Sequence, residues 1–337
     1  MLQGVDQPLV EVHDLVMLDL DGVLFHGGTV VPTAPAAVAG VRDRGTPLAF
    51  VTNNASRSPA EVADHLQSLG VTAAAGEVAT SSQAAAGLLA DRLGPGARVA
   101  VLGAAGLRDA VSRVGLVPVA VPDRPDHDRP DALVTGFGPE VVWSEVIRAG
   151  ALIASGVPWV AANADLTFPT DFGTAPGHGA LVRMLSEFSG VVPQVAGKPE
   201  PALFERVVDQ HRSTRPLMVG DRLDTDILGA RRAGVDSLLV LSGVSGLHDL
   251  LTAPADARPT YLGLDVSALL APAPAPQVVA DRVSLGGWQV RVDGSGVQVT
   301  GAGELADWWR VVATAGWSHL DRTGEPAPAD GLVPPRG

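Results

Sequence analysis

The segment Asp19-Leu20-Asp21-Gly22 places two carboxylates close together after an apolar run, Leu15-Val16-Met17-Leu18. Such a continuous run is typical of a strand that is buried on both faces of a parallel sheet. Carboxylates at the end of a buried strand are costly to desolvate unless a cation or a function compensates. Asp19 and Asp21 are therefore candidates for catalysis, with a helix cap as the ordinary structural alternative.

Polar residues recur where other predicted strands end or helices begin. Thr52-Asn53-Asn54 follows a second apolar run, and Gly220-Asp221 and Thr225-Asp226 follow a later one. Lys198 precedes the helix start Pro199-Glu200-Pro201, where backbone N–H groups favour anions. Each cluster alone could be a turn, a surface charge or a cap. Ligand sites of open α/β sheets lie beyond the carboxyl ends of the strands, so their joint occurrence favours one shared site.

The residue types of these clusters indicate phosphoryl transfer. Three aspartates with a backbone carbonyl form a hard oxygen site suited to Mg²⁺. A lysine and a helix N-terminus would spread positive charge over a phosphoryl group, which is what phosphoryl transfer needs.

Short apolar runs that alternate with helical patterns predict an α/β fold. We expect a doubly wound, Rossmann-like parallel-sheet core with an inserted α/β cap and a small C-terminal α+β extension. The core is predicted at 1–84 and 196–270, the cap at 85–195 and the extension at 277–337.

The predicted extension follows a Pro/Ala linker at residues 271–276. It contains an alternating hairpin pattern around Asp293-Gly294-Ser295-Gly296 and a helix over 304–315. From Thr323 on we expect a disordered tail. The clustered tryptophans of this segment favour a packing role.

The composition of the chain argues against some classes of binding partner and chemistry. The chain has 337 residues and a formal net charge of −13, so it is a poor generic partner for nucleic acid or anionic membranes. It contains no Cys, which excludes disulfides and thiolate chemistry and favours a cytoplasmic location. Neither a membrane span nor a signal peptide is recognisable.

Four motifs resemble those of the haloacid dehalogenase superfamily of phosphohydrolases. The segment VTNNASRSP and the long insert before residue 197 are similar to class IIA, whose insert is a large α/β cap. The Ala and Arg richness and the C-terminal extension are most similar to the actinobacterial glycerol 3-phosphate phosphatases of that class. The matching motifs are LDLDGVLF (18–25), VTNN (51–54), GKPEP (197–201) and GDRLDTDI (220–227).

The resemblance implies a role for each matching residue. Asp19 would be the nucleophile that forms an aspartyl-phosphate, and Asp21 the general acid and base. Thr52 and the Asn53 backbone amide would hold phosphate oxygens, and Lys198 would pair with Asp19 and the phosphate.

The resemblance also implies a metal site. Asp19, the Asp21 carbonyl and Asp221 would bind Mg²⁺. Asp226 would either bind the ion directly or support it through water or hydrogen bonds.

Two cap segments also match class IIA motifs. Ala162-Asn163-Ala164-Asp165 is similar to the cap motif T-N-x-D, with Ala162 where Thr is usual, and 176–180 is similar to P-G-x-G-A. Asn163, Asp165 and His178 are the candidates for substrate contact. A structural turn and an ordinary loop histidine are the alternatives.

The function implied is Mg²⁺-dependent hydrolysis of a small phosphate monoester, such as glycerol 3-phosphate or a related polyol or sugar phosphate. A nucleotide or phosphoglycolate phosphatase is the alternative, and a non-catalytic phosphate sensor is a remote one. We expect a small phosphorylated metabolite as partner, and a homodimer is compatible with the resemblance.

Overall fold

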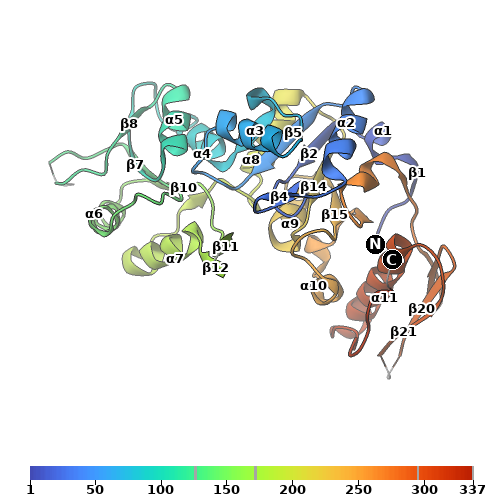
Figure 1. Ribbon diagram of the computed structural model, residues 1–337. Helices are drawn as coiled ribbons and strands as arrows, with labels where there is room; N and C mark the ends of the chain where they lie inside the picture. The colour runs from blue at the N-terminus through green and yellow to red at the C-terminus, as the bar shows by residue number, and fades with distance from the viewer. Residues whose placement is uncertain (125–126, 171–172, 294–295, 336–337) are drawn as a thin grey trace. The chain divides into compact units, whose positions relative to one another are not determined.

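The computed structural model describes residues 1–124, 127–170, 173–293 and 296–335 (Figure 1). The chain forms two compact units, one made of residues 1–48 and 211–337 and the other of residues 49–210. Both contain parallel strands joined by helices, which confirms the predicted α/β class. The predicted boundaries of core, cap and extension stay predictions.

The first unit is built on four parallel strands in the order β16-β15-β14-β2. All four residues of β2 are buried, as expected for a strand covered on both faces. The Val16 amide also donates to the carbonyl of Pro47, just before β5 (Leu48–Thr52). The four strands are β2 (Leu15–Leu18), β14 (Pro216–Gly220), β15 (Asp236–Val240) and β16 (Tyr261–Gly263).

The sequence after β14 predicts a helix from Thr225 to Ala233, and the structure departs from this prediction. Residues Leu223–Ile227 form a π-helical turn, and the α-helix α9 begins only at Leu228. The cause is the Arg222 carbonyl, which accepts bonds from the amides of both Asp226 and Ile227, at 3.1 and 3.2 Å. Such wide turns often occur at functional sites.

Short elements complete the connections of the first unit. Two hairpin strands follow β2, and helices connect the strands of the sheet. These elements are α1 (Leu9–Val12), β3 (Phe25–His26), β4 (Thr29–Val30), α2 (Ala34–Asp43), α9 (Leu228–Arg232), α10 (Leu247–Thr252) and the 3₁₀ turns Ala255–Ala257 and Val266–Leu270.

The C-terminal part of this unit is a four-stranded antiparallel sheet covered by α11 (Leu305–Thr323), as Figure 1 shows for β20 and β21. The predicted hairpin is therefore part of a larger sheet, and the predicted helix is longer than expected. Residues 294 and 295 of the predicted turn lie outside the described residues. The strands are β18 (Gln277–Val279), β19 (Arg282–Leu285), β20 (Trp288–Asp293) and β21 (Gly296–Gly301).

Two predictions about this region are wrong. The expected linker contains β17 (Pro272–Ala273), which pairs with β1 (Val5–Pro8). The expected disordered tail is ordered in its described part, up to residue 335, because the Val297 amide donates to the Pro328 carbonyl and Ala327 is buried in the local apolar core. Residues 336 and 337 of the expected tail lie outside the described residues. Both segments find partners that are distant in sequence, which composition alone does not reveal.

The second unit contains the parallel pair β5 and β6 and a five-stranded parallel sheet in the order β13-β10-β9-β7-β8. Its strands are β6 (Val78–Thr80), β7 (Arg98–Leu102), β8 (Val117–Val119), β9 (Ala132–Thr135), β10 (Trp159–Ala161) and β13 (Gln194–Val195), with the hairpin β11 (Thr167–Thr170) and β12 (Gly173–Pro176).

The helices of the second unit follow the start and stop signals of the sequence. The sequence Ser58-Pro59-Ala60-Glu61 predicts a helix start with Ser58 as the N-cap, and this is confirmed, since Ser58 and Glu61 form a capping box at the N-terminus of α3. Among all described residues, no helix combines the length and the apolarity needed to cross a bilayer. The helices are α3 (Pro59–Ser68), α4 (Ser81–Ala90), α5 (Ala105–Arg113), α6 (Trp143–Ala154), α7 (His178–Ser189) and α8 (Ala202–His211), with a 3₁₀ turn at Ala75–Glu77.

Candidate active site

Asp19 and Asp21 lie in a tight turn at the carboxyl end of β2. The Asp19 amide donates to the Val219 carbonyl of the neighbouring strand at 2.9 Å, which fixes the position of Asp19 at the sheet edge. Gly22 has φ +88°, a conformation that favours glycine, and its amide donates to the Phe25 carbonyl at 2.8 Å. Asp19 is half-buried and Asp21 is exposed, so the two carboxylates occupy different environments.

The structure brings Asp19, Asp221 and Asp226 together. One carboxylate oxygen of each lies within 4.8 Å of the others. Asp221, which directly follows β14, and Asp226, in the π-helical turn, are both 0% exposed. The carboxylate of Asp21 is not a member of this group of three. We call Asp19, Asp221 and Asp226 the carboxylate cluster.

Glycines and backbone amides shape the surroundings of the cluster. A Cβ on Gly22 or Gly243 would lie 2.3 or 2.0 Å from Asp221 Oδ2, so only glycine fits on these sides of the carboxylate. The Val244 amide donates to Asp221 Oδ2 at 2.7 Å, and the Arg222 amide donates to Asp226 Oδ2 at 3.1 Å. Each of the two buried acids thus accepts a hydrogen bond from a backbone amide, which holds its carboxylate in place.

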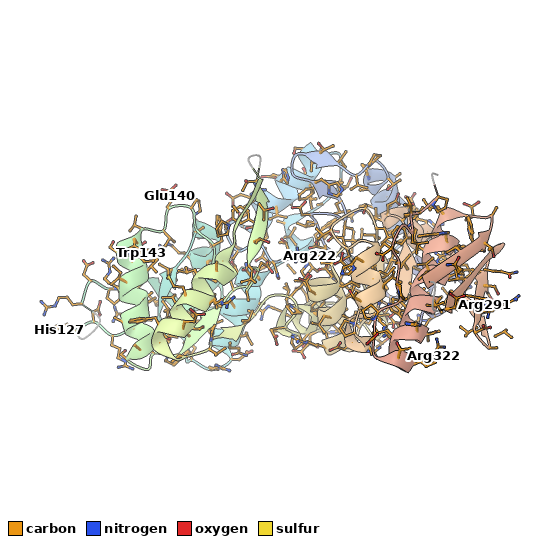
Figure 2. The ribbon with its side chains drawn as sticks, turned by 90° about the horizontal axis from the view of Figure 1, so that it is seen from below. His127, Glu140, Trp143, Arg222, Arg291 and Arg322 are labelled. Atoms are coloured by element: carbon orange, nitrogen blue, oxygen red, sulfur yellow. The ribbon has the colours of Figure 1, made fainter. Side chains whose placement is uncertain are left out.

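The carboxylate cluster fits a hard divalent cation. Its donors are all oxygens, and three carboxylates at this separation repel one another unless positive charge compensates them. The side chain of Arg222, labelled in Figure 2, forms an ion pair with Asp224 at 2.8 Å. The chemistry of the donors is that of a Mg²⁺ site.

In the second unit, Asn53 connects three segments. Its Nδ2 donates to both carboxylate oxygens of Asp165, each at 3.1 Å, and to the Lys198 carbonyl at 2.9 Å. Its Oδ1 accepts from the Lys198 amide at 2.8 Å. Its carbonyl accepts from Asn163 Nδ2 at 2.6 Å and from Ser81 Oγ at 2.7 Å. These residues together are called the Asn53 cluster.

Lys198 and Thr52 lie at the same end of β5. Lys198 is only 3% exposed, and its Nζ donates to the Val51 carbonyl at 3.4 Å. Thr52 is buried, and its Oγ1 accepts from the Asn54 amide at 3.1 Å. The peptide bond between Lys198 and Pro199 is cis. Lysine side chains are rarely this buried, so the Lys198 ammonium is held in one place by the protein, unlike a solvated surface lysine.

Asn163, Asp165 and His178, the candidates for substrate contact, are held by protein contacts. Asn163 and Asp165 bond to Asn53, as described above, and His178 Nδ1 donates to the Asn163 carbonyl at 2.9 Å. Desolvation lowers the pKa of the buried His178 to about 4, against the opposing effect of this hydrogen bond. His178 is therefore neutral near pH 7. Substrate contact by these three residues stays a prediction.

Sequence reasoning missed the segment Ser242-Gly243-Val244-Ser245, which follows β15. It contributes the glycine next to Asp221, an amide donor to its carboxylate, and Ser242 Oγ, which donates to the Gly22 carbonyl at 2.7 Å. The signal was present in the sequence, since a cluster of Ser and Gly follows an apolar run at a strand end, as in the recognised motifs.

Comparison with known proteins places the chain in a family. A family model described as "Haloacid dehalogenase-like hydrolase" matches residues 16–117, and a second, HAD-hydrolase-like model matches residues 195–269. The chain is 45% identical over 305 residues to D-glycerol 3-phosphate phosphatase of Mycobacterium tuberculosis, covering 89% of this chain and 82% of that protein. It is 32% identical to an acid sugar phosphatase of Staphylococcus saprophyticus, over 75% and 95% of the two chains.

Solved structures agree with this assignment. The crystal structure of a Mycobacterium tuberculosis glycerol phosphate phosphatase in complex with magnesium matches with a TM-score of 0.84 and 43% identity, covering 93% of this chain and 92% of that one. The chain belongs to the haloacid dehalogenase-like hydrolase family. It is a phosphatase of that family, with the α/β fold that the sequence predicted.

Proposed function

We propose that the protein hydrolyses a small phosphate monoester with Mg²⁺ and that glycerol 3-phosphate is its preferred substrate. The carboxylate cluster is the observation that carries the proposal, because three acids from two segments that are distant in sequence converge on one point. The similarity to a glycerol 3-phosphate phosphatase over 89% of the chain supports the choice of substrate.

Asp19 is proposed as the nucleophile. Its carboxylate oxygen forms a bond to phosphorus while the bond between phosphorus and the ester oxygen breaks, which gives an aspartyl-phosphate. Asp21 donates a proton to the departing oxygen. It then accepts a proton from the water that attacks the intermediate, and inorganic phosphate and free Asp19 result. The exposure of Asp21 suits a group that exchanges protons with substrate and water.

Asp19, Asp221 and the Asp21 carbonyl are proposed to hold Mg²⁺, with Asp226 as either a ligand or a support for it. The ion would neutralise charge on the phosphoryl oxygens and on the carboxylates. The backbone donors to Asp221 and Asp226 orient both carboxylates for this purpose.

Thr52, the Asn53 amide and Lys198 are proposed to bind phosphate oxygens of the substrate. The low exposure of Lys198 supports this, since a poorly solvated ammonium interacts strongly with an anion. Asn163 and Asp165 are proposed to contact the substrate. They also bond to Asn53, which in turn bonds to the backbone of Lys198, so we propose that they help to position Lys198 as well.

A panel of phosphate esters tests the function. Phosphate release from glycerol 3-phosphate, phosphoglycolate, sugar phosphates and nucleoside monophosphates is measured with Mg²⁺ and with a chelator. We expect the highest kcat/KM for glycerol 3-phosphate and no release with the chelator. A higher value for a nucleotide or for phosphoglycolate would move the assignment to that alternative. Phosphate binding without any hydrolysis would favour the sensor.

The cellular setting is part of the proposal. A cytoplasmic enzyme is consistent with the absence of Cys from the sequence. A homodimer is proposed from the resemblance to class IIA, and sedimentation analysis at micromolar concentration tests it. A monomer in that measurement would contradict the homodimer and leave the catalytic assignment unaffected.

A further inference from the structure

The segment Ser242–Ser245 touches the carboxylate cluster from a side that the recognised motifs do not cover. The Val244 amide donates to Asp221 Oδ2 at 2.7 Å, and the Ser245 amide donates to the Asp221 carbonyl at 3.1 Å. Both the backbone and the side chain of Asp221 are therefore fixed by this segment. Its position determines where the Asp221 carboxylate lies.

Ser245 also holds the beginning of the π-helical turn. Its Oγ accepts from the Leu223 amide at 3.1 Å, and Ser245 is only 7% exposed. The same turn contains Asp226, whose Oδ2 accepts from the Arg222 amide. One serine thus connects two members of the carboxylate cluster, Asp221 directly and Asp226 through the turn.

The segment continues without interruption into α10, and α10 packs against the C-terminal helix α11. Trp317 Nε1 on α11 donates to the Leu250 carbonyl on α10 at 2.7 Å, and both residues are fully buried. A Cβ on Gly316 would lie 2.3 Å from Leu251 Cδ2, so the two helices approach closely at this point.

The residues after α10 are also fastened to α11. The Arg258 guanidinium donates to both carboxylate oxygens of Asp321, at 2.8 and 2.7 Å, and to the Ala253 carbonyl at 3.1 Å. It also lies over the Trp317 ring, 5.5 Å from the centroid. The two ends of α10 therefore differ. One faces the carboxylate cluster, and the other is anchored to the C-terminal extension.

We propose that Ser245 is a positioning residue for the Mg²⁺-binding carboxylates and that α11, acting through α10, holds it in place. The C-terminal extension then has two roles. It packs against the rest of the first unit, and it influences the affinity of the carboxylate cluster for Mg²⁺. This inference rests on the proposed function, because it assumes that Asp221 binds the ion. Groups that orient metal ligands typically change metal affinity by about 10- to 100-fold when removed.

The test measures Mg²⁺ binding to the full-length protein by calorimetry, without substrate. Ser245→Ala removes the acceptor for the Leu223 amide and is expected to raise the Kd for Mg²⁺ about tenfold. Ser245→Thr keeps the hydroxyl and is expected to restore affinity close to the wild type. Trp317→Phe removes the donor to Leu250 and is expected to raise the Kd about threefold.

Val290→Ala is the matched control. Val290 is fully buried on β20 within the same extension, so its truncation lowers thermal stability, but it makes none of the bonds described above. We expect a lower Tm with an unchanged Kd for Mg²⁺. A rise in Kd equal to that of Trp317→Phe would mean that general loosening explains the effect, and would overturn the role of α11.

The outcomes for the two proposals are separable. If the wild type binds Mg²⁺ and releases phosphate while Ser245→Ala and Trp317→Phe bind Mg²⁺ as tightly as the wild type, this inference is wrong and the proposed function stands. If the wild type binds no Mg²⁺ and releases no phosphate, the proposed function itself is wrong.

Discussion

The carboxylate cluster and the Asn53 cluster are held in different ways. In the first unit, the buried acids lie against glycines and accept bonds from backbone amides, so the positions of loops define the site. In the second unit, a single amide side chain joins segments that are far apart in sequence. A group of acids needs space for a cation and backbone donors with fixed positions. A lysine needs a fixed backbone, so that its ammonium group stays in one place.

This difference predicts which substitutions affect chemistry and which affect stability. Changes in the carboxylate cluster should reduce turnover or metal binding with little loss of stability. Changes in the Asn53 cluster should lower the free energy of unfolding of the second unit. The predictions below run from the largest expected effect to the smallest.

Asp19→Asn is expected to lower kcat for phosphate release at least about 10⁴-fold, because an amide is a poor nucleophile. The substitution preserves shape, so the Tm should stay near or above that of the wild type. Asp6→Asn, at an exposed position on β1, is the control and should leave kcat unchanged. Turnover in Asp19→Asn equal to that of the wild type would reject Asp19 as the nucleophile.

Asn53→Ala is expected to lower the free energy of unfolding by about 3 kcal/mol, since it leaves several buried groups unsatisfied, including the Lys198 amide and carbonyl. Urea denaturation measures the change. Asn54→Ala, at the neighbouring exposed position, should cost less than about 1 kcal/mol. Equal effects of the two substitutions would show that Asn53 does not join the segments energetically.

Gly243→Ala is expected to weaken Mg²⁺ binding and kcat by about 50-fold, because the new Cβ would meet Asp221 Oδ2 at 2.0 Å and displace the carboxylate. Gly28→Ala is the control, since a Cβ there meets nothing within 4 Å. Calorimetry and steady-state kinetics measure the two effects. An unchanged Mg²⁺ affinity would mean that the glycine contact does not set the position of Asp221.

His178 makes the second unit sensitive to acid. Its pKa is lowered from 6.5 to about 4 by burial, so the unfolded chain binds a proton that the folded one does not. Stability is therefore complete above pH 6.5 and falls as the pH decreases toward 4. The loss attributable to His178 is roughly 2 kcal/mol at pH 5.

Denaturation of the wild type and of His178→Gln between pH 7 and pH 4 measures this contribution. The loss of stability between these pH values should be smaller in His178→Gln. The exposed His127 provides the control, and His127→Gln should keep the acid sensitivity of the wild type. An equal pH dependence in His178→Gln and the wild type would contradict the assignment.

Much of the fold followed from local patterns. The apolar run before Asp19 and the capping residues Ser58 and Glu61 gave the right elements, because burial and capping depend on neighbouring residues. The C-terminal region was less predictable. Its supposed linker pairs with β1, and its tail binds the Val297 amide. Both interactions join residues that are far apart in sequence, and the Pro- and Ala-rich composition of these segments gives no local signal for them.

The sequence by itself determined the family and identified the aspartates and the lysine of the recognised motifs as site residues. It also determined that the ligands offered to a cation are oxygens. These features depend only on the type and order of the residues. Only the tertiary structure decided that Gly243 and Ser245 border Asp221, that Asn53 fastens Lys198, and that α11 reaches the site through α10. The physical reason is that strand order and helix packing bring together residues separated by long stretches of chain. No local propensity encodes such contacts.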